Sequence, residues 1–465
     1  MTLVIVTIIL LSYILIATEK FTNISKAAVA IFIGTLVWIL YVGYGMDFVT
    51  SHHSSEYANF LALRPSSSVE VKNFIAQNIF LRYVGKASEV VLFLLSTMAI
   101  TEILVNNGCF DFLTRLIRTR HSKRMLWIVS ALTFVISANL DNLTTTVIML
   151  TVMHGVVVKQ KQRILMGCAI AISANCGGAL TVIGDPTGLV LWNTGAVTAT
   201  NYSMTLAVPC LVAWALPVWW IGRMLPPHVE VENMMLTYRG DDANVKTWQR
   251  ILMLMIGIGG LWFIPTFHNI TKLSPFVGAL CVVAVLCVVN EIITRKSLNP
   301  EEKVKRRGLR ALQYDVMQMI LFVLGIMLTV GVVCETGIAD SIEGWLKDYC
   351  SDALVLGLIA QAASSVLDNF VTSVSVLSVS APTLLGDGAD MASKADLGLC
   401  WKAIAFSSSV GGNILCIGSM SGLALMKIER IKLGWYLRNV GWVAMIGSVL
   451  GLLIMNFLCS PTALF

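Results

Sequence analysis

Long apolar runs dominate the chain, and short polar stretches separate them. A helix needs about 20 apolar residues to cross a bilayer core that is about 30 Å thick. The first run is expected to be a retained helix rather than a signal peptide, because no basic residue precedes it and no small-residue cleavage pattern follows. Plain membrane-spanning helices are predicted at residues 2–18, 27–45, 90–107, 201–222, 251–266, 274–292, 316–334 and 436–458.

Four further apolar stretches are longer, and polar residues interrupt each of them. As continuous helices the longest would measure about 50 Å, which is well beyond the bilayer core. A broken helix at membrane depth is tolerated only where the freed backbone is buried in protein or lines a cavity. We therefore predict re-entrant hairpins at residues 126–158 and 353–380, and broken membrane-crossing helices at residues 164–196 and 400–426.

The second half of the chain repeats three sequence blocks of the first half in the same order. The difference in residue number between matching positions stays at about 230 throughout, which indicates an internal duplication. The matching blocks are Leu92–Asp111 with Leu321–Asp340, Ser137–Thr146 with Ser364–Ser373, and Ser173–Gly188 with Ser407–Gly422.

The basic residues predict that the two copies have opposite orientations. In the first copy a basic cluster that begins at Arg115 follows the opening helix, whereas in the second copy the basic cluster 295–310 precedes it. Basic loops favour the cytoplasmic side of a membrane, and this topology places most of the 33 Lys and Arg residues on that side. The expected fold class is an all-α polytopic membrane protein with two inverted-topology repeats, each with a re-entrant helical hairpin and a broken transmembrane helix.

These features divide the chain into four consecutive segments. Residues 1–88 are expected to hold N-terminal transmembrane helices and an outer loop. Within that loop, the spacing of four apolar residues is typical of an interfacial helix: Val71, Phe74, Ile75 and Ile79. Residues 89–222 form repeat 1, residues 223–313 form connecting helices and cytoplasmic loops, and residues 314–458 form repeat 2.

Composition supports the membrane assignment and excludes other classes. The chain of 465 residues is 56% hydrophobic and 13% charged, whereas a soluble domain has about 25% charged residues. The net charge of +6 resides in loops that set topology, so membrane lipid and not nucleic acid is the expected partner. The 11 cysteines include no C-x-x-C pair. No nucleotide-binding or hydrolase motif is present, so neither enzyme activity nor a cofactor is expected.

Polar residues at mid-membrane depth gather at the four helix breaks. Each hairpin tip has Asp-Asn followed by hydroxyl residues, and each broken helix has Gly-Gly close to amide or hydroxyl residues. Glycine permits unwound backbone, and carboxylate, amide and hydroxyl oxygens can replace the water around a small cation. The primary candidates for ion binding are Asp141, Asn142, Thr144, Thr145, Asn175, Asp185, Thr187, Asp368, Asn369 and Thr372. The secondary candidates are Ser137, Ser364, Ser408, Ser409, Asn413 and Glu102, of which Glu102 could relay protons.

Three of these candidates, Asp141, Asp185 and Asp368, lie in stretches without Lys or Arg. A buried carboxylate without a basic partner takes up a proton unless a cation supplies the opposing charge. Proton and cation would then compete for the same oxygens, which is the requirement for exchange transport. Any one of these aspartates could instead serve only as the N-cap of a helix. The presence of an aspartate at each of two equivalent hairpin tips favours a role in ion binding. Glu335 lies at a helix end and is expected to be interfacial. His154 is a lone histidine and is expected to be structural.

The same motifs resemble those of the NhaD-type sodium:proton antiporters of the ion transporter superfamily. The resemblance covers about residues 89–458 and rests on Asp141-Asn142, its echo Asp368-Asn369, and the segments around Asn175. It implies exchange of Na+ or Li+ for H+ across a bacterial inner membrane by a multi-pass protein, a homodimer and an elevator-like motion. By position it implies an ion-binding and proton-coupling set with Na+ at Asp141, Asp368 and neighbouring oxygens. The full set is Asp141, Asn142, Asn175, Asp185, Thr187, Asp368 and Asn369.

One residue departs from that pattern, and other functions stay open. Gly188 stands where a hydroxyl residue is expected. The Gly-Asp-Pro segment at residues 184–186 also resembles anion and arsenite permeases of the same superfamily, so an anion, arsenite or carboxylate permease is the second hypothesis. A channel would need a polar stripe along whole helices, whereas the polar groups here cluster at the breaks. A membrane receptor without transport activity is a more distant alternative.

Overall fold

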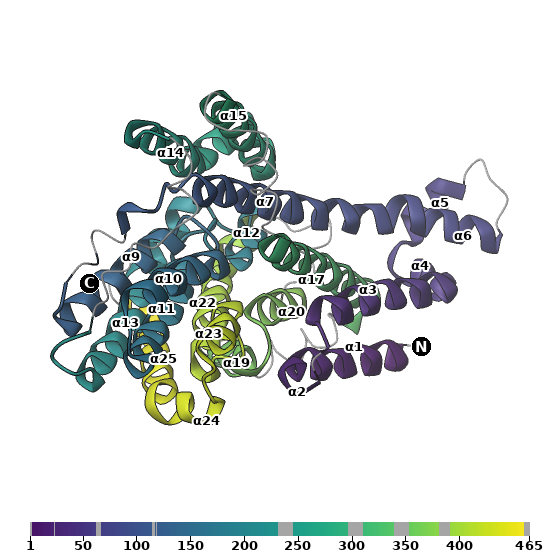
Figure 1. Cartoon of the computed structure of the whole chain (residues 1–465). Coiled ribbons are helices and arrows are strands. Elements are labelled where there is room, and N and C mark those ends of the chain that lie inside the picture. The colour runs from purple at the N-terminus through teal and green to yellow at the C-terminus, as the bar shows by residue number, and fades with distance from the viewer. Residues whose placement is uncertain are drawn as a thin grey trace. The chain divides into compact units, whose positions relative to one another are not determined.

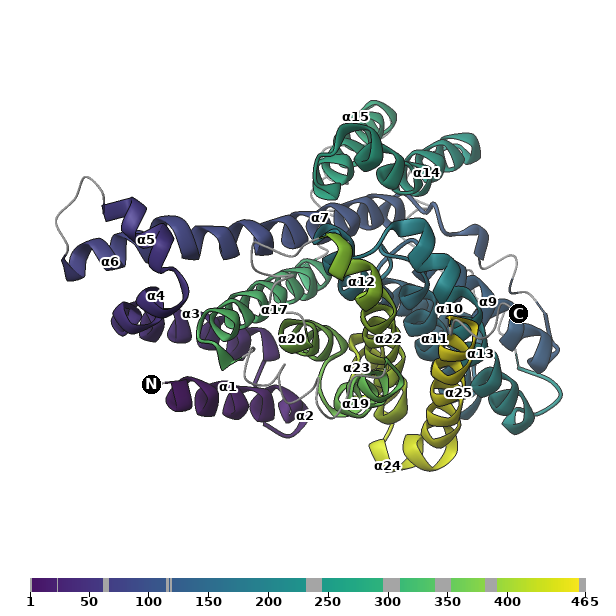
Figure 2. The same cartoon turned by 180° about the vertical axis from the view of Figure 1, so that it is seen from behind.

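The computed structural model describes residues 2–22, 24–61, 67–113, 117, 119–230, 245–295, 310–338, 353–380 and 391–459. Nearly all of this part of the chain is helical (Figures 1 and 2). Among the described residues, nine helices are long and apolar enough to cross a membrane. The prediction of an all-α, multi-pass membrane protein is therefore confirmed.

Helices are present at every range where the sequence predicts a plain span. Their bounds are α1 Thr2–Ala17, α3 Lys26–Gly43, α7 Leu81–Asn106, α13 Ala199–Met224, α14 Thr247–Thr271, α15 Pro275–Arg295, α17 Arg310–Glu335 and α25 Trp442–Cys459. Shorter helical segments are α2 Glu19–Thr22, α4 Gly45–His52, α5 Ser54–Leu61, α6 Ser68–Phe74, η1 Ile75–Phe80, α24 Leu433–Tyr436 and η2 Leu437–Gly441.

The segment expected as an outer loop is largely helical. Residues 68–106 form one continuous helical stretch of 39 residues in which α6, η1 and α7 follow one another. The apolar face of α6 and η1 is buried, and on this face Phe74 packs against the rings of Tyr57 and Phe60 of α5. This face therefore belongs to the protein interior, and the expected interfacial helix at Val71–Ile79 is wrong.

The four interrupted stretches break at the polar positions. The hairpin pairs are α9 Ser122–Ser137 with α10 Asn142–Val156, and α19 Ala353–Val366 with α20 Asn369–Ser380. The broken-helix pairs are α11 Gln160–Leu180 with α12 Pro186–Asn193, and α22 Met391–Leu415 with α23 Met420–Glu429. The longest hairpin helix has 16 residues, or about 24 Å, which is shorter than a bilayer core. Re-entry of these hairpins into a membrane stays a prediction.

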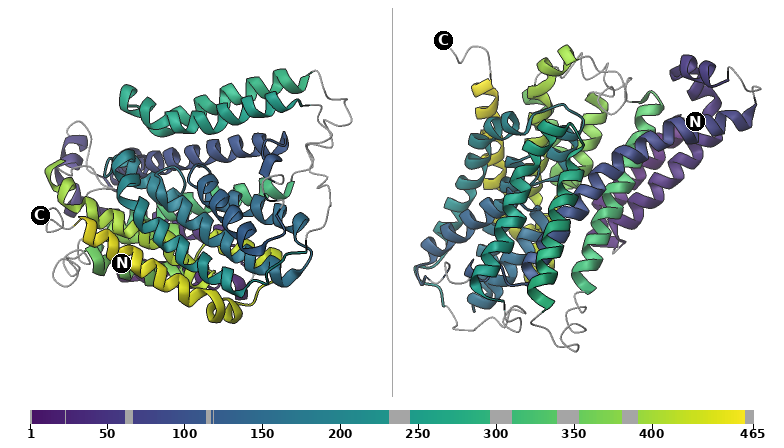
Figure 3. Two further views of the ribbon diagram at one scale, coloured as in Figure 1. Left: turned by 90° about the vertical axis from the view of Figure 1, so that its left-hand side faces the viewer. Right: turned by 90° about the horizontal axis from the view of Figure 1, so that it is seen from above.

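The chain divides into two compact units. Unit 1 comprises Met1–Val91, Gln313–Ser351 and Val374–Asp396, and unit 2 comprises Leu92–Leu312, Asp352–Ser373 and Leu397–Phe465. Within unit 2, α13 packs along α25 and α14 packs along α15 (Figure 3). Both hairpin tips and both helix breaks belong to unit 2. The four consecutive segments expected from the sequence stay a prediction.

Equivalent glycines in unit 2 have equivalent surroundings. A Cβ on Gly177 in α11 would overlap the carbonyl oxygen of Phe134 in α9. A Cβ on Gly411 in α22 would lie 2.8 Å from the carbonyl oxygen of Gln361 in α19. In both copies glycine thus lets the broken helix cross the hairpin helix at backbone contact. This agreement supports the duplication, while the inverted orientation stays a prediction.

Candidate functional site

The first residues of α10, α12, α20 and α23 contact one another within unit 2. The side-chain amide of Asn369 donates a hydrogen bond to the Asp185 carboxylate over 2.9 Å. The backbone N–H of Asn369 donates to the Gly418 carbonyl over 3.1 Å. The Ser421 hydroxyl donates to the Asn142 carbonyl over 3.1 Å. The structure therefore brings both hairpin tips and both helix breaks into one junction.

Side chains cap all four of these helix starts. A cap satisfies backbone N–H groups that have no partner in the first turn of a helix. The capping oxygens and their N–H donors are those of Asp141 with Thr144 at 3.0 Å, Asp185 with Thr187 at 3.2 Å, Asp368 with Phe370 at 3.1 Å, and Ser419 with Gly422 at 3.1 Å. The three aspartates therefore do cap helices. Each cap occupies one carboxylate oxygen, so the second oxygen of each aspartate can have other partners.

The second oxygen of Asp141 is buried without a protein partner. Asp141 is 3% exposed, and no hydrogen bond to its Oδ2 is found among the described residues. Within the same ranges, the buried hydroxyls of Thr145, Thr372 and Ser373 also have no partner. Nearly all buried polar atoms in proteins are paired, so orphaned ones point to a missing water or ion. Both hairpins therefore offer free oxygens that a small cation could use.

Asp185 has a different environment. Its Oδ2 accepts hydrogen bonds from the Asn369 amide and from the Ser409 hydroxyl, each at 2.9 Å. The hydroxyls of Thr187 and Ser409 lie 3.2 Å apart. Both oxygens of Asp185 thus have protein partners, and the candidates Thr187, Asn369 and Ser409 surround it.

Asn175 connects the other side of the junction. Its amide donates to the side-chain carbonyl of Asn413 over 2.8 Å and to the Ser419 hydroxyl over 2.9 Å. Its own side-chain carbonyl accepts from the amide of Asn142 over 3.2 Å. Asn175 therefore contacts both Asn142 and Asn413, and a shared role of the three in ion binding stays a prediction.

The secondary candidates have mixed outcomes. The Ser137 hydroxyl donates to the Ala174 carbonyl over 2.6 Å, and the equivalent Ser364 hydroxyl donates to the Ser408 carbonyl. These serines fasten each hairpin to its broken helix and point at backbone, not at the junction. Glu102 is half-buried in α7 and, within the described ranges, has no hydrogen bond to the junction.

Sequence reasoning did not select two residues that the junction uses. Ser419 caps α23 and accepts from Asn175, and its position opposite Asp185 in the repeat could have identified it. The Tyr436 hydroxyl donates to the Asn413 carbonyl over 2.7 Å, but it lies outside the repeated blocks and no sequence signal marks it.

The glycine at position 188 has a packing explanation. A Cβ there would lie 3.0 Å from Val182 Cα and 3.2 Å from the Thr181 carbonyl oxygen. The equivalent Gly422 is confined in the same way by Cys416. A hydroxyl residue therefore has no room at either position.

A second polar cluster lies in unit 1. Glu335 is 6% exposed and accepts hydrogen bonds from His53 at 2.6 Å and from the Tyr83 hydroxyl at 2.8 Å. The expectation that Glu335 is interfacial is wrong, because these partners enclose it. The hydrogen bond to Glu335 raises the pKa of His53 above its ordinary value of 6.5, against the lowering effect of burial.

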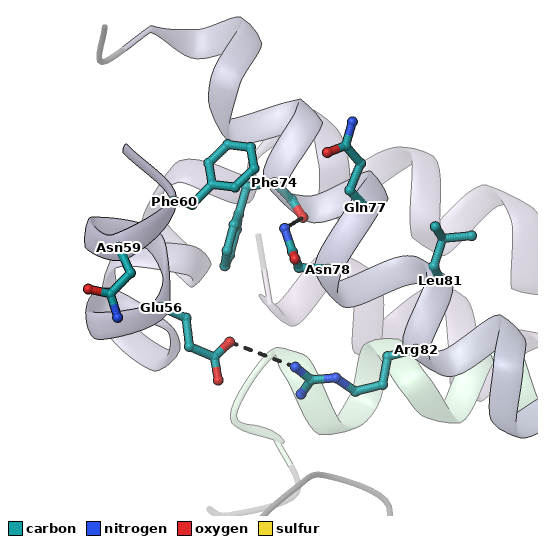
Figure 4. A pocket seen from close by; sticks show the side chains of 8 residues that line it. All are labelled: Glu56, Asn59, Phe60, Phe74, Gln77, Asn78, Leu81 and Arg82. Carbon is teal, nitrogen blue, oxygen red and sulfur yellow. Dashed lines mark hydrogen bonds and ion pairs between the residues drawn. The ribbon is translucent and has the colours of Figure 1, made fainter. Parts of the chain in front are cut away.

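Unit 1 also has an open pocket of about 760 Å³ (Figure 4). An ion pair between Arg82 and Glu56, 3.7 Å apart, lies on its wall. Its lining is Glu56, Asn59, Phe60, Phe74, Gln77, Asn78, Leu81 and Arg82. None of the site residues expected from the sequence is among them, so this pocket shares no residue with the junction.

In the part of the chain that the structure describes, no group of three or more His, Cys, Asp or Glu side chains could hold a metal ion. A cation at the junction would therefore be held by a mixture of carboxylate, amide and hydroxyl oxygens. Such ligands suit hard cations, which prefer oxygen.

Comparison with known proteins places these observations in a family. A family model described as "Citrate transporter" matches residues 13–411. The chain is 31% identical over 369 residues to "Sodium/proton antiporter 1" of Arabidopsis thaliana, a match that covers 79% of this chain and 61% of that relative. It is 26% identical over 451 residues to "Sodium/proton antiporter 2" of the same plant, covering 95% and 96%.

A bacterial relative and a solved structure agree with this result. The chain is 24% identical over 475 residues to "Na(+)/H(+) antiporter NhaD" of Vibrio cholerae, covering 96% of this chain and 89% of that one. The crystal structure of the Alcanivorax borkumensis YdaH transporter matches 85% of this chain and 90% of its own, with a TM-score of 0.55 and 14% identity. The latter shows a shared fold. The resemblance to NhaD-type antiporters and the assignment to transporters, not enzymes, are confirmed.

Proposed function

Since this chain belongs to the citrate transporter family, we propose that it is a secondary transporter that exchanges Na+ or Li+ for H+. The observation that carries this proposal is the buried Asp141 Oδ2, to which no described residue donates a hydrogen bond. A carboxylate oxygen in such surroundings binds either a proton or a cation. The names of the relatives, several of which are sodium/proton antiporters, support the same exchange.

The proposed mechanism is competition at the hairpin tips. With its proton released, Asp141 supplies a negative charge, and the hydroxyl of Thr145 can supply a further oxygen to Na+. Hairpin 2 offers the corresponding Asp368 and Thr372. Arrival of a proton removes the charge and releases the cation. The neighbouring amides of Asn142, Asn175 and Asn369 would hold the tips in the geometry that binding needs.

The cellular setting and the assembly are further parts of the proposal. The bacterial relative supports a bacterial cytoplasmic membrane. Inverted repeats suit transporters that bind substrate where broken helices meet near the bilayer midplane. A homodimer in contact with lipid, with an elevator-like motion, completes the proposal, and neither a cofactor nor nucleic acid has a part in it.

A carboxylate or other anion permease is the second candidate, because four helix starts meet at the junction. Helix N-termini carry partial positive charge and attract anions. The matched family is also described by citrate transport. Against this candidate, aspartates already occupy three of the four helix starts and would repel a second anion.

The test is dissipation of a pH gradient in inside-out membrane vesicles. Na+, Li+, K+ and citrate are added separately to vesicles with the wild type, Asp141→Asn or Glu230→Gln. Glu230 is the control because its carboxylate is 62% exposed. We expect Na+ and Li+ to dissipate the gradient, and Asp141→Asn to weaken this response by about 100-fold, the scale of losing a buried charge partner. A wild type that responds to citrate and to no monovalent cation would establish the second candidate.

A further inference from the structure

Asp185 and Asp141 both cap helices at the junction, yet they differ in hydrogen bonding. Three donors reach Asp185: the Thr187 N–H, the Asn369 amide and the Ser409 hydroxyl. The Thr144 N–H donates a hydrogen bond to Oδ1 of Asp141, and Oδ2 of the same carboxylate has no partner among the described residues. An ionised carboxylate has about four lone-pair sites. Most of those of Asp185 are therefore in use.

The donors to Asp185 come from separate elements. Asn369 begins α20, the second helix of hairpin 2, and Ser409 lies in α22, the first half of the second broken helix. Asp185 itself is the N-cap of α12 in the first copy. Its carboxylate thus holds the first copy to two elements of the second copy. A cation at Asp185 would have to share oxygens that already make these contacts.

The chain contains an uncharged version of the same contact. In the repeat, Asn175 is equivalent to Ser409, and Ser419 is equivalent to Asp185. The Asn175 amide donates to the Ser419 hydroxyl over 2.9 Å, the same distance as between Ser409 and Asp185. A neutral cap therefore supports the contact between the copies. The additional hydrogen bond that Asp185 accepts is the one from Asn369.

We propose that Asp185 is a positioning residue that holds hairpin 2 and α22 against α12, and that the transported cation binds at Asp141 and not at Asp185. This proposal rests on the proposed function, since it divides the aspartates of that site by role. Both of its parts follow from geometry: Asp185 has three donors, and Asp141 has a buried oxygen without one.

The test measures 22Na+ binding to purified full-length protein in detergent, for the wild type, Asp141→Asn and Asp185→Ser. Serine is the residue that the chain itself uses at the equivalent position 419. We expect Asp185→Ser to change the dissociation constant for Na+ by less than about threefold, and Asp141→Asn to raise it by about 100-fold or more.

Transport in proteoliposomes supplies a readout that distinguishes positioning from mere folding. Asp185→Ser should lower the maximum exchange rate while leaving the half-saturating Na+ concentration within about threefold, because hairpin 2 is less firmly held. Asp185→Asn keeps one acceptor oxygen at the same length and should restore part of the rate. Ser409→Ala should add little to Asp185→Ser, because both remove the same contact.

A folded Asp185→Ser whose Na+ binding is lost as fully as in Asp141→Asn would overturn the positioning role. If Asp185→Ser does not fold, Na+ binding by Asp185→Asn is compared with that of Asp141→Asn in its place, and an equally complete loss would overturn the positioning role. Unfolding of both Asp185 variants beside a folded Asp141→Asn supports the role, since it shows that Asp185 holds the junction. A wild type that binds no Na+ rejects the proposed function itself and the assignment to Asp141, an outcome distinct from loss in the Asp185 variants.

Discussion

At the scale of single residues, Gly188 shows how closely backbone and side chain are packed at the junction. A Cβ there would meet Val182 and Thr181. We expect Gly188→Ala to destabilise the protein by about 1–3 kcal/mol, the usual range for overpacking. Gly259 in α14 is the matched control, because nothing lies within 4 Å of a Cβ there. Thermal unfolding in detergent should show a loss for Gly188→Ala and none for Gly259→Ala; equal shifts would contradict the packing explanation.

The pair of His53 and Glu335 in unit 1 makes stability depend on pH. The hydrogen bond that His53 donates to Glu335 raises the pKa of His53 in the folded state. A group with a raised folded-state pKa contributes its full stabilisation below the unfolded pKa and loses it as the pH rises through the folded value. The relevant window therefore lies above pH 6.5, the ordinary value for histidine.

We expect the melting temperature of the wild type to fall across that window more steeply than that of His53→Gln, which cannot titrate. The measurement is a series of thermal unfolding curves from pH 6 to pH 9. His52→Gln is the neighbouring control and should retain the wild-type slope. A slope that is the same in His53→Gln as in the wild type would exclude this pair as the source.

Residue roles at the junction were predictable in kind but not in detail. Asp141 and Asp185 are recognisable from the sequence, because an acidic residue within a long apolar stretch is a local signal. Their difference comes from Asn369 and Ser409, which lie far along the chain from Asp185 and leave no local trace. Glu335 was misjudged for the same reason, since its partner His53 belongs to a distant segment.

At the scale of helices, a buried ion pair joins three elements of unit 2. Glu429 at the end of α23 is 1% exposed and lies 2.8 Å from the Arg163 Nε at the start of α11. His154 in the last turn of α10 lies 3.4 Å from the same carboxylate. His154 is a lone histidine in its own segment of the sequence, whereas in the structure it belongs to this cluster.

We expect Arg163→Gln to destabilise the protein by about 3–5 kcal/mol, because it leaves a buried carboxylate without its cation. The exposed pair of Lys159 and Glu230, which are 56% and 62% exposed, provides the control. Lys159→Gln should cost less than about 1 kcal/mol. Thermal unfolding of both variants tests this, and similar losses in the two would show that burial of Glu429 is not decisive.

Helix breaks were well predicted because their causes are local. A capping residue followed by proline marks the start of a new helix, and at the break before α12 Asp185 caps the helix that Pro186 begins. The segment 68–88 was not predicted correctly, because an apolar helix face looks the same whether lipid or protein covers it. In the structure that face is buried in protein, and two rings of α5 pack against its Phe74.

At the scale of the whole molecule, the inverted topology makes a prediction about sidedness. Lys161 at the start of α11 and Lys402 in α22 both precede the break of their own broken helix. If the copies are inverted, the two residues face opposite sides of the membrane. Lys161 is exposed and Lys402 is partly exposed, so a cysteine at either position can be labelled.

We expect a membrane-impermeant thiol reagent to label Lys161→Cys in inside-out vesicles and Lys402→Cys in right-side-out vesicles. The exposed Cys281, Cys287 and Cys459 are replaced by alanine, and this background without an added cysteine is the control. Labelling of both positions from one side would contradict the inversion.

The matching glycine contacts also suggest how the protein could be redesigned. Gly177 and Gly411 are the same in both copies because the helix crossing leaves no room for a side chain. The caps at Asp185 and Ser419 differ, although they accept equivalent hydrogen bonds. A mutant library for altered exchange rate can therefore keep these glycines and exchange cap residues between the copies. Each exchange places a residue in surroundings that its counterpart already occupies.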